Sequence, residues 1–302
     1  MAVKIDSTKG KQVAQLLSRS FNTVGIHGRS DMPEDQRPRG VDLGSLDHIL
    51  FLTQTVAIDY QRDAPALWDS SRNTFEDPET AYLFDPKALH ETPFRKVVSD
   101  MQKHGLSKKP TKDTQIWRTV GITFLKKWSG DPRLFIKDCG WDCPTVLVRL
   151  KRDTHLYNVA MVPDYPFLRG DKIGPLWLRM LRDNAGISGL RALDKVPIPV
   201  DIHVARATLS LGVVNGKFSG KLIDLFSLIR EAWFESVRGL EVKGRPMIAL
   251  DVDEPLWHLS KYGCSYRDGS TGICRRKKGC EVRDFCTNGK IKIDKGQVEL
   301  DT

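Results

Sequence analysis

The stretch "LDHILFLTQTVAIDY", residues 46–60, decides the fold class of this 302-residue chain. Its apolar residues are spread too widely around a helix for a surface helix, whose apolar side chains form a single stripe. Ser45 or Asp42, just before the stretch, can cap the N-terminus of such a helix. We therefore expect a buried helix here, with other elements packed around it.

Helical spacing of apolar residues recurs along the rest of the chain. It predicts further helices at 6–21, 94–104, 113–129, 174–183, 202–212 and 220–239. The choice between helix and β-hairpin stays open for residues 145–162, because this segment is rich in β-branched residues. The sequence thus predicts an all-α protein.

The composition favours an acidic partner. Lys and Arg number 47 against 38 Asp and Glu, a net charge of +9, and such an excess favours nucleic acid, although a generally basic protein without that partner is the alternative. No apolar run approaches the roughly 20 residues of a membrane helix, and the N-terminus lacks the apolar core of a signal peptide. We expect a protein inside the cell, with no membrane partner.

Four of the six cysteines lie close together in the tail "YGCSYRDGSTGICRRKKGCEVRDFC". In a reducing compartment such a cluster favours metal binding over disulfides, and four thiolates bind either Zn²⁺ or an iron–sulfur cluster. The gaps of nine, five and five residues contain no CxxC pair, which favours a [4Fe-4S] cluster over zinc and leaves unrelated thiols as the last alternative. The expected ligands are Cys264, Cys274, Cys280 and Cys286, whereas Cys139 and Cys143 are expected to be buried thiols.

A run of four cations lies between the second and third of these cysteines. If a metal pins the loop, the run becomes a rigid clamp for phosphates; otherwise it is a solvated charged segment. Its members are Arg275, Arg276, Lys277 and Lys278.

The segment "KVPIPVDIHVAR", residues 195–206, places Asp201 behind two prolines and ahead of a predicted helix. Asp201 is either an ordinary N-cap or a carboxylate held on a rigid element for chemistry. The local sequence leaves both interpretations open.

Five segments, in order, resemble the helix–hairpin–helix DNA glycosylase superfamily and its endonuclease III-like iron–sulfur branch. They are "LFLTQTVAIDYQRDAPALW" (50–68), residues 97–131, "FLRGDKIGPLWLRML" (167–181), "PVDIHVAR" (199–206) and "CEVRDFC" (280–286). The resemblance covers most of the chain. It implies two lobes, a helical barrel at 46–200 that carries the hairpin, and a second lobe of 1–45 plus 201–302 that carries a structural cluster.

The resemblance also implies a function. Such an enzyme flips a modified base out of duplex DNA and cleaves its N-glycosidic bond, with Asp201 stabilising the cationic sugar or activating water. Lys172 would attack the sugar as an amine nucleophile or contact a phosphate. We expect a DNA-associated monomer, in the nucleus or at the nucleoid.

Further contacts follow from the same resemblance. Gln54 would contact DNA, with a buried amide as the alternative, and the amides of Gly170 and Gly174 would approach a phosphate, with a plain turn as the alternative. A flipped base is held by stacking, so the pocket would include aromatic side chains, although core packing is the alternative for each of Trp177, Trp141 and Tyr60.

Two departures from the family pattern weaken these assignments. Only the last cysteine gap agrees with the family, and the hairpin reads "LRGDKIGPL" with Lys172 inside it, 29 residues before Asp201. AP-lyase activity therefore stays open. A non-catalytic iron–sulfur DNA-binding protein and a glycosidase for free nucleosides are the alternative functions.

Overall fold

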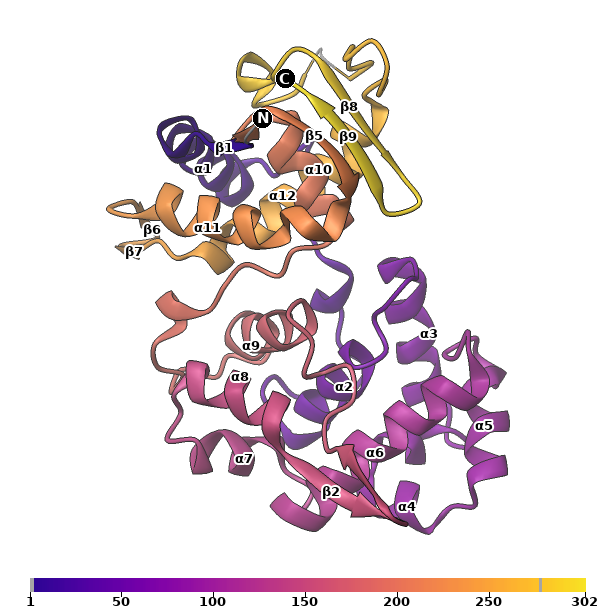
Figure 1. Cartoon of the computed structure of the whole chain (residues 1–302). Helices are drawn as coiled ribbons and strands as arrows, with labels where there is room; N and C mark the ends of the chain where they lie inside the picture. The colour runs from indigo at the N-terminus through magenta and orange to yellow at the C-terminus, as the bar shows by residue number, and fades with distance from the viewer. Residues whose placement is uncertain (1–2, 277–278) are drawn as a thin grey trace. The chain divides into compact units, whose positions relative to one another are not determined.

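The computed structural model describes residues 3–276 and 279–302, and these residues form a mostly helical protein (Figure 1). They contain twelve α-helices and four small antiparallel sheets. The predicted helical character is confirmed, but the sheets depart from a purely all-α fold. No helix among the described residues has both the length and the apolarity needed to cross a bilayer.

The chain divides into two compact units. Unit 1 comprises Met1–Asp31 and Val196–Thr302, and unit 2 comprises Met32–Lys195. The first boundary lies before the predicted residue 46, because Glu34 forms a buried ion pair with Arg179 of unit 2. The second lies before residue 201, because Ile198 and Val200 are buried in the core of unit 1.

Unit 1 contains four helices and seven short strands among its described residues. Strand β1 pairs with β4, β6 pairs with β7, and β9 lies between β5 and β8, all antiparallel (Figure 1). The elements are β1 (Lys4–Ile5), α1 (Ser7–Thr23), α10 (Ile202–Ser210), β4 (Val214–Asn215), β5 (Lys217–Lys221), α11 (Phe226–Val237), β6 (Glu241–Val242), β7 (Arg245–Pro246), α12 (Asp253–Tyr262), β8 (Lys290–Asp294) and β9 (Gln297–Asp301).

The core of unit 1 follows from the predicted amphipathic helices. Asp6 caps α1 by accepting a hydrogen bond from the Lys9 backbone N–H at 2.9 Å, and α1 then turns Leu17 into the core. Trp233 of α11 is fully buried, and its indole N–H donates to Thr208 Oγ1 of α10 at 2.9 Å. A buried indole with a satisfied N–H fixes the two helices against each other.

Unit 2 is a bundle of eight helices with one β-hairpin in its described residues. The elements are α2 (Leu46–Val56), α3 (Ala64–Glu76), α4 (Pro86–Glu91), α5 (Phe94–Lys103), α6 (Pro110–Trp128), α7 (Pro132–Asp138), α8 (Cys143–Arg152), β2 (Thr154–Tyr157), β3 (Ala160–Pro163) and α9 (Ile173–Asp183).

Helix α2 is the buried helix that its sequence predicted. Ser45 caps it by accepting from the His48 N–H at 3.2 Å, and every residue from 48 to 56 is buried. Trp177 of α9 is fully buried and donates to Thr53 Oγ1 on α2 at 2.9 Å. The single-stripe rule for surface helices therefore identified an interior helix correctly.

Residues 145–162 divide between the two alternatives that the sequence left open. Helix α8 continues to Arg152, and β2 and β3 then form a hairpin in which Leu156 lies opposite Met161. Asn158 turns the chain with a φ of 54°, a left-handed conformation that asparagine tolerates better than most residues.

Candidate functional site

The four tail cysteines lie within electrostatic range of one another in unit 1. Cys264 follows α12 and is buried. Burial raises the pKa of its thiol, and the charges of Cys286, Cys280 and Cys274 raise it further. Burial likewise raises the pKa of Cys280 to about 11, with contributions from Cys286 and Cys274. The thiols of Cys264 and Cys280 are therefore costly to ionise unless a cation compensates the charge.

Glycines shape the loop that carries these cysteines. Gly272 and Gly279 have φ values of 70° and 77°, a region that favours glycine. A Cβ at Gly272 would lie 2.5 Å from the Gly289 carbonyl oxygen, so this turn also needs glycine for space. These two glycines therefore permit turns of the chain between the cysteines.

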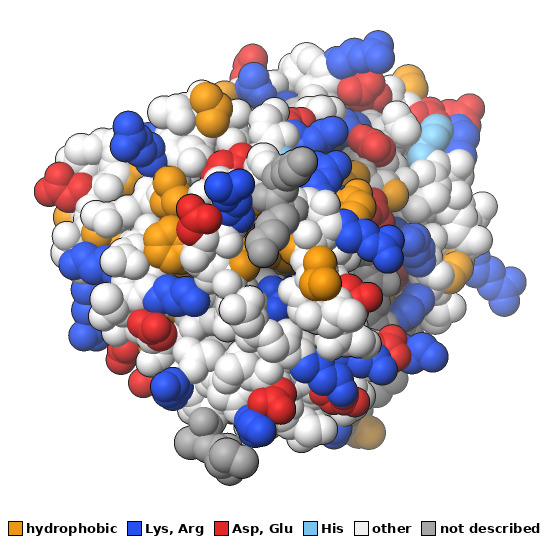
Figure 2. All heavy atoms as spheres, turned by 90° about the horizontal axis from the view of Figure 1, so that it is seen from above, with side chains coloured by type: hydrophobic (Ala, Val, Ile, Leu, Met, Phe, Trp, Pro, Cys, Tyr) orange, Lys and Arg blue, Asp and Glu red, His pale blue; other side chains and the backbone are white. Residues whose placement is uncertain are grey.

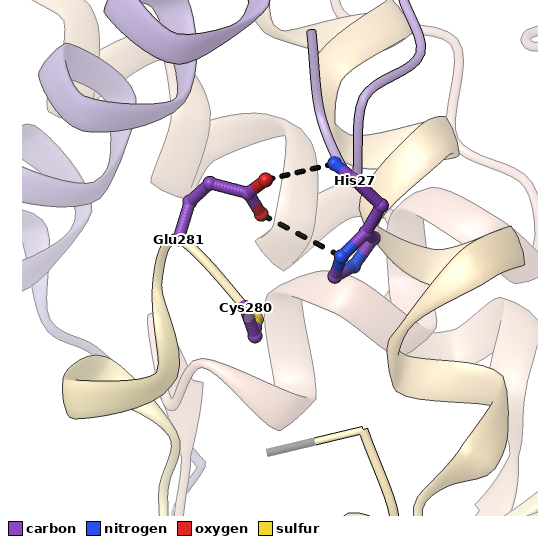
Figure 3. A group of neighbouring side chains, drawn as sticks. All are labelled: His27, Cys280 and Glu281. Atoms are coloured by element: carbon purple, nitrogen blue, oxygen red, sulfur yellow. Dashed lines mark hydrogen bonds and ion pairs between the residues drawn. The ribbon is translucent and has the colours of Figure 1, made fainter. Parts of the chain in front are cut away.

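Three residues around Cys280 bring possible metal ligands together. One ligand atom each of His27, Cys280 and Glu281 lies within 4.8 Å of the other two. Figure 3 shows Glu281 facing His27 with Cys280 beside them. The Glu281 carboxylate accepts from the His27 backbone N–H at 2.8 Å through Oε1, and its Oε2 lies 3.7 Å from His27 Nδ1.

Two polar atoms of this group lack hydrogen-bond partners in the described part of the chain. They are His27 Nε2 and Glu281 Oε2, and both atoms are buried. Buried polar atoms without protein partners are rare in folded proteins, and a bound ion or an ordered water commonly satisfies them. The donor set of one thiol sulfur, one imidazole nitrogen and one carboxylate oxygen is suited to a transition metal.

The predicted cationic clamp is only partly described. Arg275 and Arg276 are exposed, and the Arg276 guanidinium lies 5.0 Å from the centroid of the Tyr266 ring. Lys277 and Lys278 lie outside the described residues. On the face drawn in Figure 2, Lys and Arg side chains are spread widely with Asp and Glu among them, rather than gathered in one patch.

Asp201 is the N-cap of α10, and both of its described hydrogen bonds use one oxygen. Oδ1 accepts from the N–H groups of His203 at 2.7 Å and Val204 at 2.9 Å. Oδ2 has no hydrogen-bond partner among the described residues. The two interpretations of the sequence, a cap and a carboxylate held for chemistry, are therefore compatible in one side chain.

Arg206, one turn along α10, connects Asp201 electrostatically with the cysteines. Burial lowers the pKa of Arg206, and the negative charges of Cys264 and Asp201 oppose that shift. Its Nη1 also lies 3.5 Å from Ser260 Oγ. The half-buried Arg206 is thus within electrostatic range of both the Asp201 carboxylate and the Cys264 thiol.

The hairpin glycines of unit 2 do not present their amides outward. The Gly170 N–H donates to the Phe167 carbonyl and the Gly174 N–H to the Gly170 carbonyl, both at 2.9 Å. Gly174 is needed for packing, because a Cβ there would lie 2.9 Å from Leu147 Cδ2. Because both N–H groups are already used within the turn, the geometry favours the alternative of a plain turn over the expected phosphate contact.

Lys172 is paired within the same region. Its Nζ lies 3.1 Å from Asp59 Oδ2, and the Asp59 carboxylate is itself nearly buried. An ammonium held against a carboxylate is a weaker nucleophile than a free amine. The arrangement thus argues against Lys172 as the attacking group.

Gln54 is buried in unit 2, with 1% of its surface exposed. Its Nε2 would lie only 2.7 Å from a Cβ at Gly121, so the amide packs against the glycine face of α6. This burial favours the alternative of a buried amide over the expected DNA contact. Neither amide atom has a hydrogen-bond partner in the described residues.

The three aromatic residues predicted for a base pocket have different surroundings. Trp177 is fully buried and bonded to Thr53, which supports core packing. Trp141 packs on Gly189. Tyr60 stacks on Phe167 with ring centroids 4.2 Å apart, and its hydroxyl donates to Asp113 Oδ1 at 2.5 Å.

Two groupings were not predicted from the sequence. One is His27 with Glu281, which are 254 residues apart. The other places the ammonium groups of Lys109 and Lys112 at 4.9 and 5.3 Å from the Tyr60 ring centroid. The only sequence signal for the second was the basic segment "SKKPTKD" (107–113), whose spacing gives no hint of an aromatic partner.

Comparisons with protein-family models and with curated proteins identified no relative of this chain. The resemblance to the glycosylase superfamily therefore rests on the five segments quoted above.

Proposed function

We propose that this protein is a base-excision DNA glycosylase of the helix–hairpin–helix type, acting on a modified base in duplex DNA. The observation that carries the proposal is the geometry of Asp201. Two backbone amides hold Oδ1 in place, while Oδ2 has no hydrogen-bond partner among the described residues. A carboxylate fixed in this way has one oxygen available for substrate without any rearrangement.

The chemistry requires such a group. When the N-glycosidic bond breaks, its electrons leave with the base, and the sugar becomes positively charged. Asp201 Oδ2 would stabilise that charge or accept a proton from the attacking water, whose oxygen then bonds to C1′ while the departing base gains a proton. Because Oδ1 already caps α10, the helix positions the side chain before substrate arrives.

We further propose that Cys264, Cys274, Cys280 and Cys286 hold a [4Fe-4S] cluster, with zinc as the alternative. In a tetrahedral zinc site with Zn–S bonds of about 2.3 Å, the sulfurs lie roughly 3.8 Å apart. Among the described residues the group of ligand atoms within 4.8 Å contains a single cysteine, which favours the wider cage of a cluster. The cluster would tie the tail loop to α12 and α10, a structural role.

The geometry favours hydrolysis over lyase action. Lyase chemistry needs a free amine to form a Schiff base with the sugar, whereas Lys172 is ion-paired with Asp59. We therefore assign strand cleavage no part in the proposal. Borohydride trapping of a covalent protein–DNA adduct would contradict this assignment.

The proposal is tested by Asp201→Asn. Asparagine is also a good N-cap, so the substitution keeps the two bonds to Oδ1 and removes only the negative charge. We expect excision in single-turnover assays to fall by at least about 100-fold while DNA affinity is retained. The substrates are duplexes that each carry one modified base.

Asp224→Asn is the matched control, because Asp224 is exposed in the same unit and its loss changes the net charge equally. Excision at the wild-type rate by Asp201→Asn would overturn the proposal.

A second candidate function is a non-catalytic DNA-binding protein. The observation that favours it is the state of unit 2, where Gln54 and Trp177 are buried and Lys172 is paired. Wild-type protein that binds duplex DNA but releases no base from any modified duplex would support this candidate over the first.

A further inference from the structure

His27 lies at the tip of a strained turn in unit 1. Residue 27 has a φ of 53°, between Gly25 at 76° and Gly28 at 73°, and Ile26 and Arg29 exchange backbone hydrogen bonds at 2.7 and 3.1 Å across the turn. A left-handed conformation is uncommon for histidine and is often found at functional sites. The left-handed backbone at residue 27 costs conformational free energy, and it determines where the His27 side chain points.

That side chain is directed into the cysteine region. The His27 side chain is 5% exposed, its Nε2 has no hydrogen-bond partner in the described residues, and its ring belongs to the group that includes Cys280 (Figure 3). On the other side, a Cβ at Gly263 would lie 2.5 Å from His27 Nε2. The glycine before Cys264 therefore leaves the space that the ring occupies.

Glu281 holds the ring in this position. One carboxylate oxygen accepts from the His27 backbone N–H, and the other faces Nδ1 at 3.7 Å. With Glu281 on the Nδ1 side, Nε2 is the ring atom left to act toward the thiols. A protonated imidazole ring donates from both nitrogens, so a carboxylate on the Nδ1 side fixes the ring's orientation and leaves Nε2–H available.

We propose that His27 is an outer-shell positioning residue of the cysteine centre. With both ring nitrogens protonated, Nε2–H donates a hydrogen bond to the Cys280 thiolate when the centre holds its metal, and Nδ1–H faces the Glu281 carboxylate, which orients the ring. This inference rests on the proposed four-cysteine centre. It does not depend on whether the protein excises bases.

The physical consequence is a more stable centre. A thiolate carries negative charge, and a hydrogen bond from a fixed N–H stabilises that charge. Hydrogen bonds to cysteine sulfurs also set the reduction potential of iron–sulfur clusters. Loss of the donor should therefore accelerate metal release and, for an iron–sulfur cluster, lower its reduction potential, because the reduced form is the more negative one.

The test uses the full chain, purified under anaerobic conditions with its metal, and follows metal release to a chromogenic chelator. We expect His27→Ala to release metal at least about 10-fold faster, the low end of typical outer-shell effects. His27→Asn should release it more slowly than His27→Ala, because asparagine keeps an N–H donor and tolerates the left-handed backbone. Glu281→Gln should fall between wild type and His27→Ala.

His258→Ala is the control for the loss of a buried imidazole. His258 lies on α12 of the same unit, is fully buried, and has no hydrogen-bond partner on either ring nitrogen among the described residues. Equal acceleration in His258→Ala and His27→Ala would overturn the inference, because it would indicate general loosening of unit 1. A wild-type release rate in folded His27→Ala, checked by circular dichroism, would overturn it as well.

The metal-release measurements distinguish failure of this inference from failure of the proposed four-cysteine centre and of the proposed base excision. Wild-type protein that holds no metal would overturn both the four-cysteine centre and the role of His27, while the Asp201→Asn assay would still report on base excision. Metal held equally well with and without His27 would overturn the inference alone.

Discussion

The cysteine region of unit 1 and the hairpin region of unit 2 differ in how their polar groups are satisfied. Around Cys280, the buried atoms His27 Nε2 and Glu281 Oε2 have no hydrogen-bond partners among the described residues. In the hairpin region, the Gly170 and Gly174 amides bond to nearby carbonyls and Lys172 pairs with Asp59.

The difference is informative because an unsatisfied buried polar atom costs about 1–3 kcal/mol. The region around Cys280 contains such atoms. It is therefore a better candidate for a metal or ligand site than the hairpin region, whose polar groups are already paired. Outside the hairpin region, unit 2 also contains buried polar atoms without hydrogen-bond partners among the described residues, such as the amide of Gln54 and His48 Nε2.

The largest expected effect is that of Cys264→Ala. Cys264 is buried, and its thiol is coupled to the other three thiols, so its loss should remove most of the bound metal and destabilise unit 1 by several kcal/mol. Metal analysis and thermal unfolding measure both effects.

Cys143→Ala is the control for Cys264→Ala, because Cys143 is a fully buried thiol of unit 2. Burial raises its pKa to about 12, so it should act as packing only, and its variant should keep the metal. Equal metal content in the two variants would contradict the claim that the cysteine region of unit 1 binds the metal.

The second prediction concerns the contribution of the buried ion pair of unit 2 to the stability of the protein. Glu34→Ala removes the carboxylate that faces the buried Arg179 guanidinium, and breaking such a pair costs about 3–5 kcal/mol. Urea unfolding measures the loss. Asp69→Ala, which removes the exposed partner of Arg72, should cost less than about 1 kcal/mol, and similar losses in the two variants would contradict the prediction.

A pH titration compares the two units through one buried histidine each. Burial lowers the pKa of His48 in unit 2 and of His258 in unit 1 to about 4. The unfolded chain binds these protons near pH 6.5, so stability is complete above about pH 7 and is lost as the pH falls toward 4.

At pH 4.5 we expect each histidine to lower the free energy of unfolding by roughly 2 kcal/mol. Urea unfolding at pH 7 and 4.5, for wild type, His48→Gln and His258→Gln, measures this. A variant that loses as much stability as wild type between the two values would contradict the assignment for its unit.

The smallest effect concerns Gln54, one of the buried groups of unit 2 whose polar atoms lack hydrogen-bond partners among the described residues. If its buried amide has only a structural role, Gln54→Met should stabilise the protein by about 1 kcal/mol, because the substitution removes an unpaired polar group at similar volume. The exposed Gln115→Met on α6 is the control and should change little. Destabilisation by Gln54→Met would show that the amide has a partner in solution.

Much of the fold followed from local sequence signals. The helices at α1, α2, α5, α6, α9, α10 and α11 were predicted from apolar spacing. Ser45, one of the two candidate caps of α2, is its N-cap. Apart from the β-hairpin left open at 145–162, the short strands were not predicted, because segments of two to five residues carry too little alternation to distinguish them from loops. In the sheet of β5, β9 and β8, strand β5 pairs with β9, whose residues lie about 80 positions further along the chain.

The candidate site was predictable only in part. Asp201 and the four cysteines stood out because their residue types and neighbours have direct chemical meaning. The roles of Gly170, Gly174 and Gln54 could not be read in the same way, because whether an amide is free or already bonded depends on the surrounding turn. His27 gave no signal, since its partner Glu281 lies 254 residues further along the chain.

The sequence by itself determined where helices begin, which faces they bury and which residue types are available for chemistry, because caps and periodicity act over a few residues. The tertiary structure alone decided which polar groups find partners. It paired Lys172 with Asp59, occupied the hairpin amides, and placed His27 beside Cys280. These pairings depend on how distant segments pack, and packing is decided by the whole core rather than by any one segment.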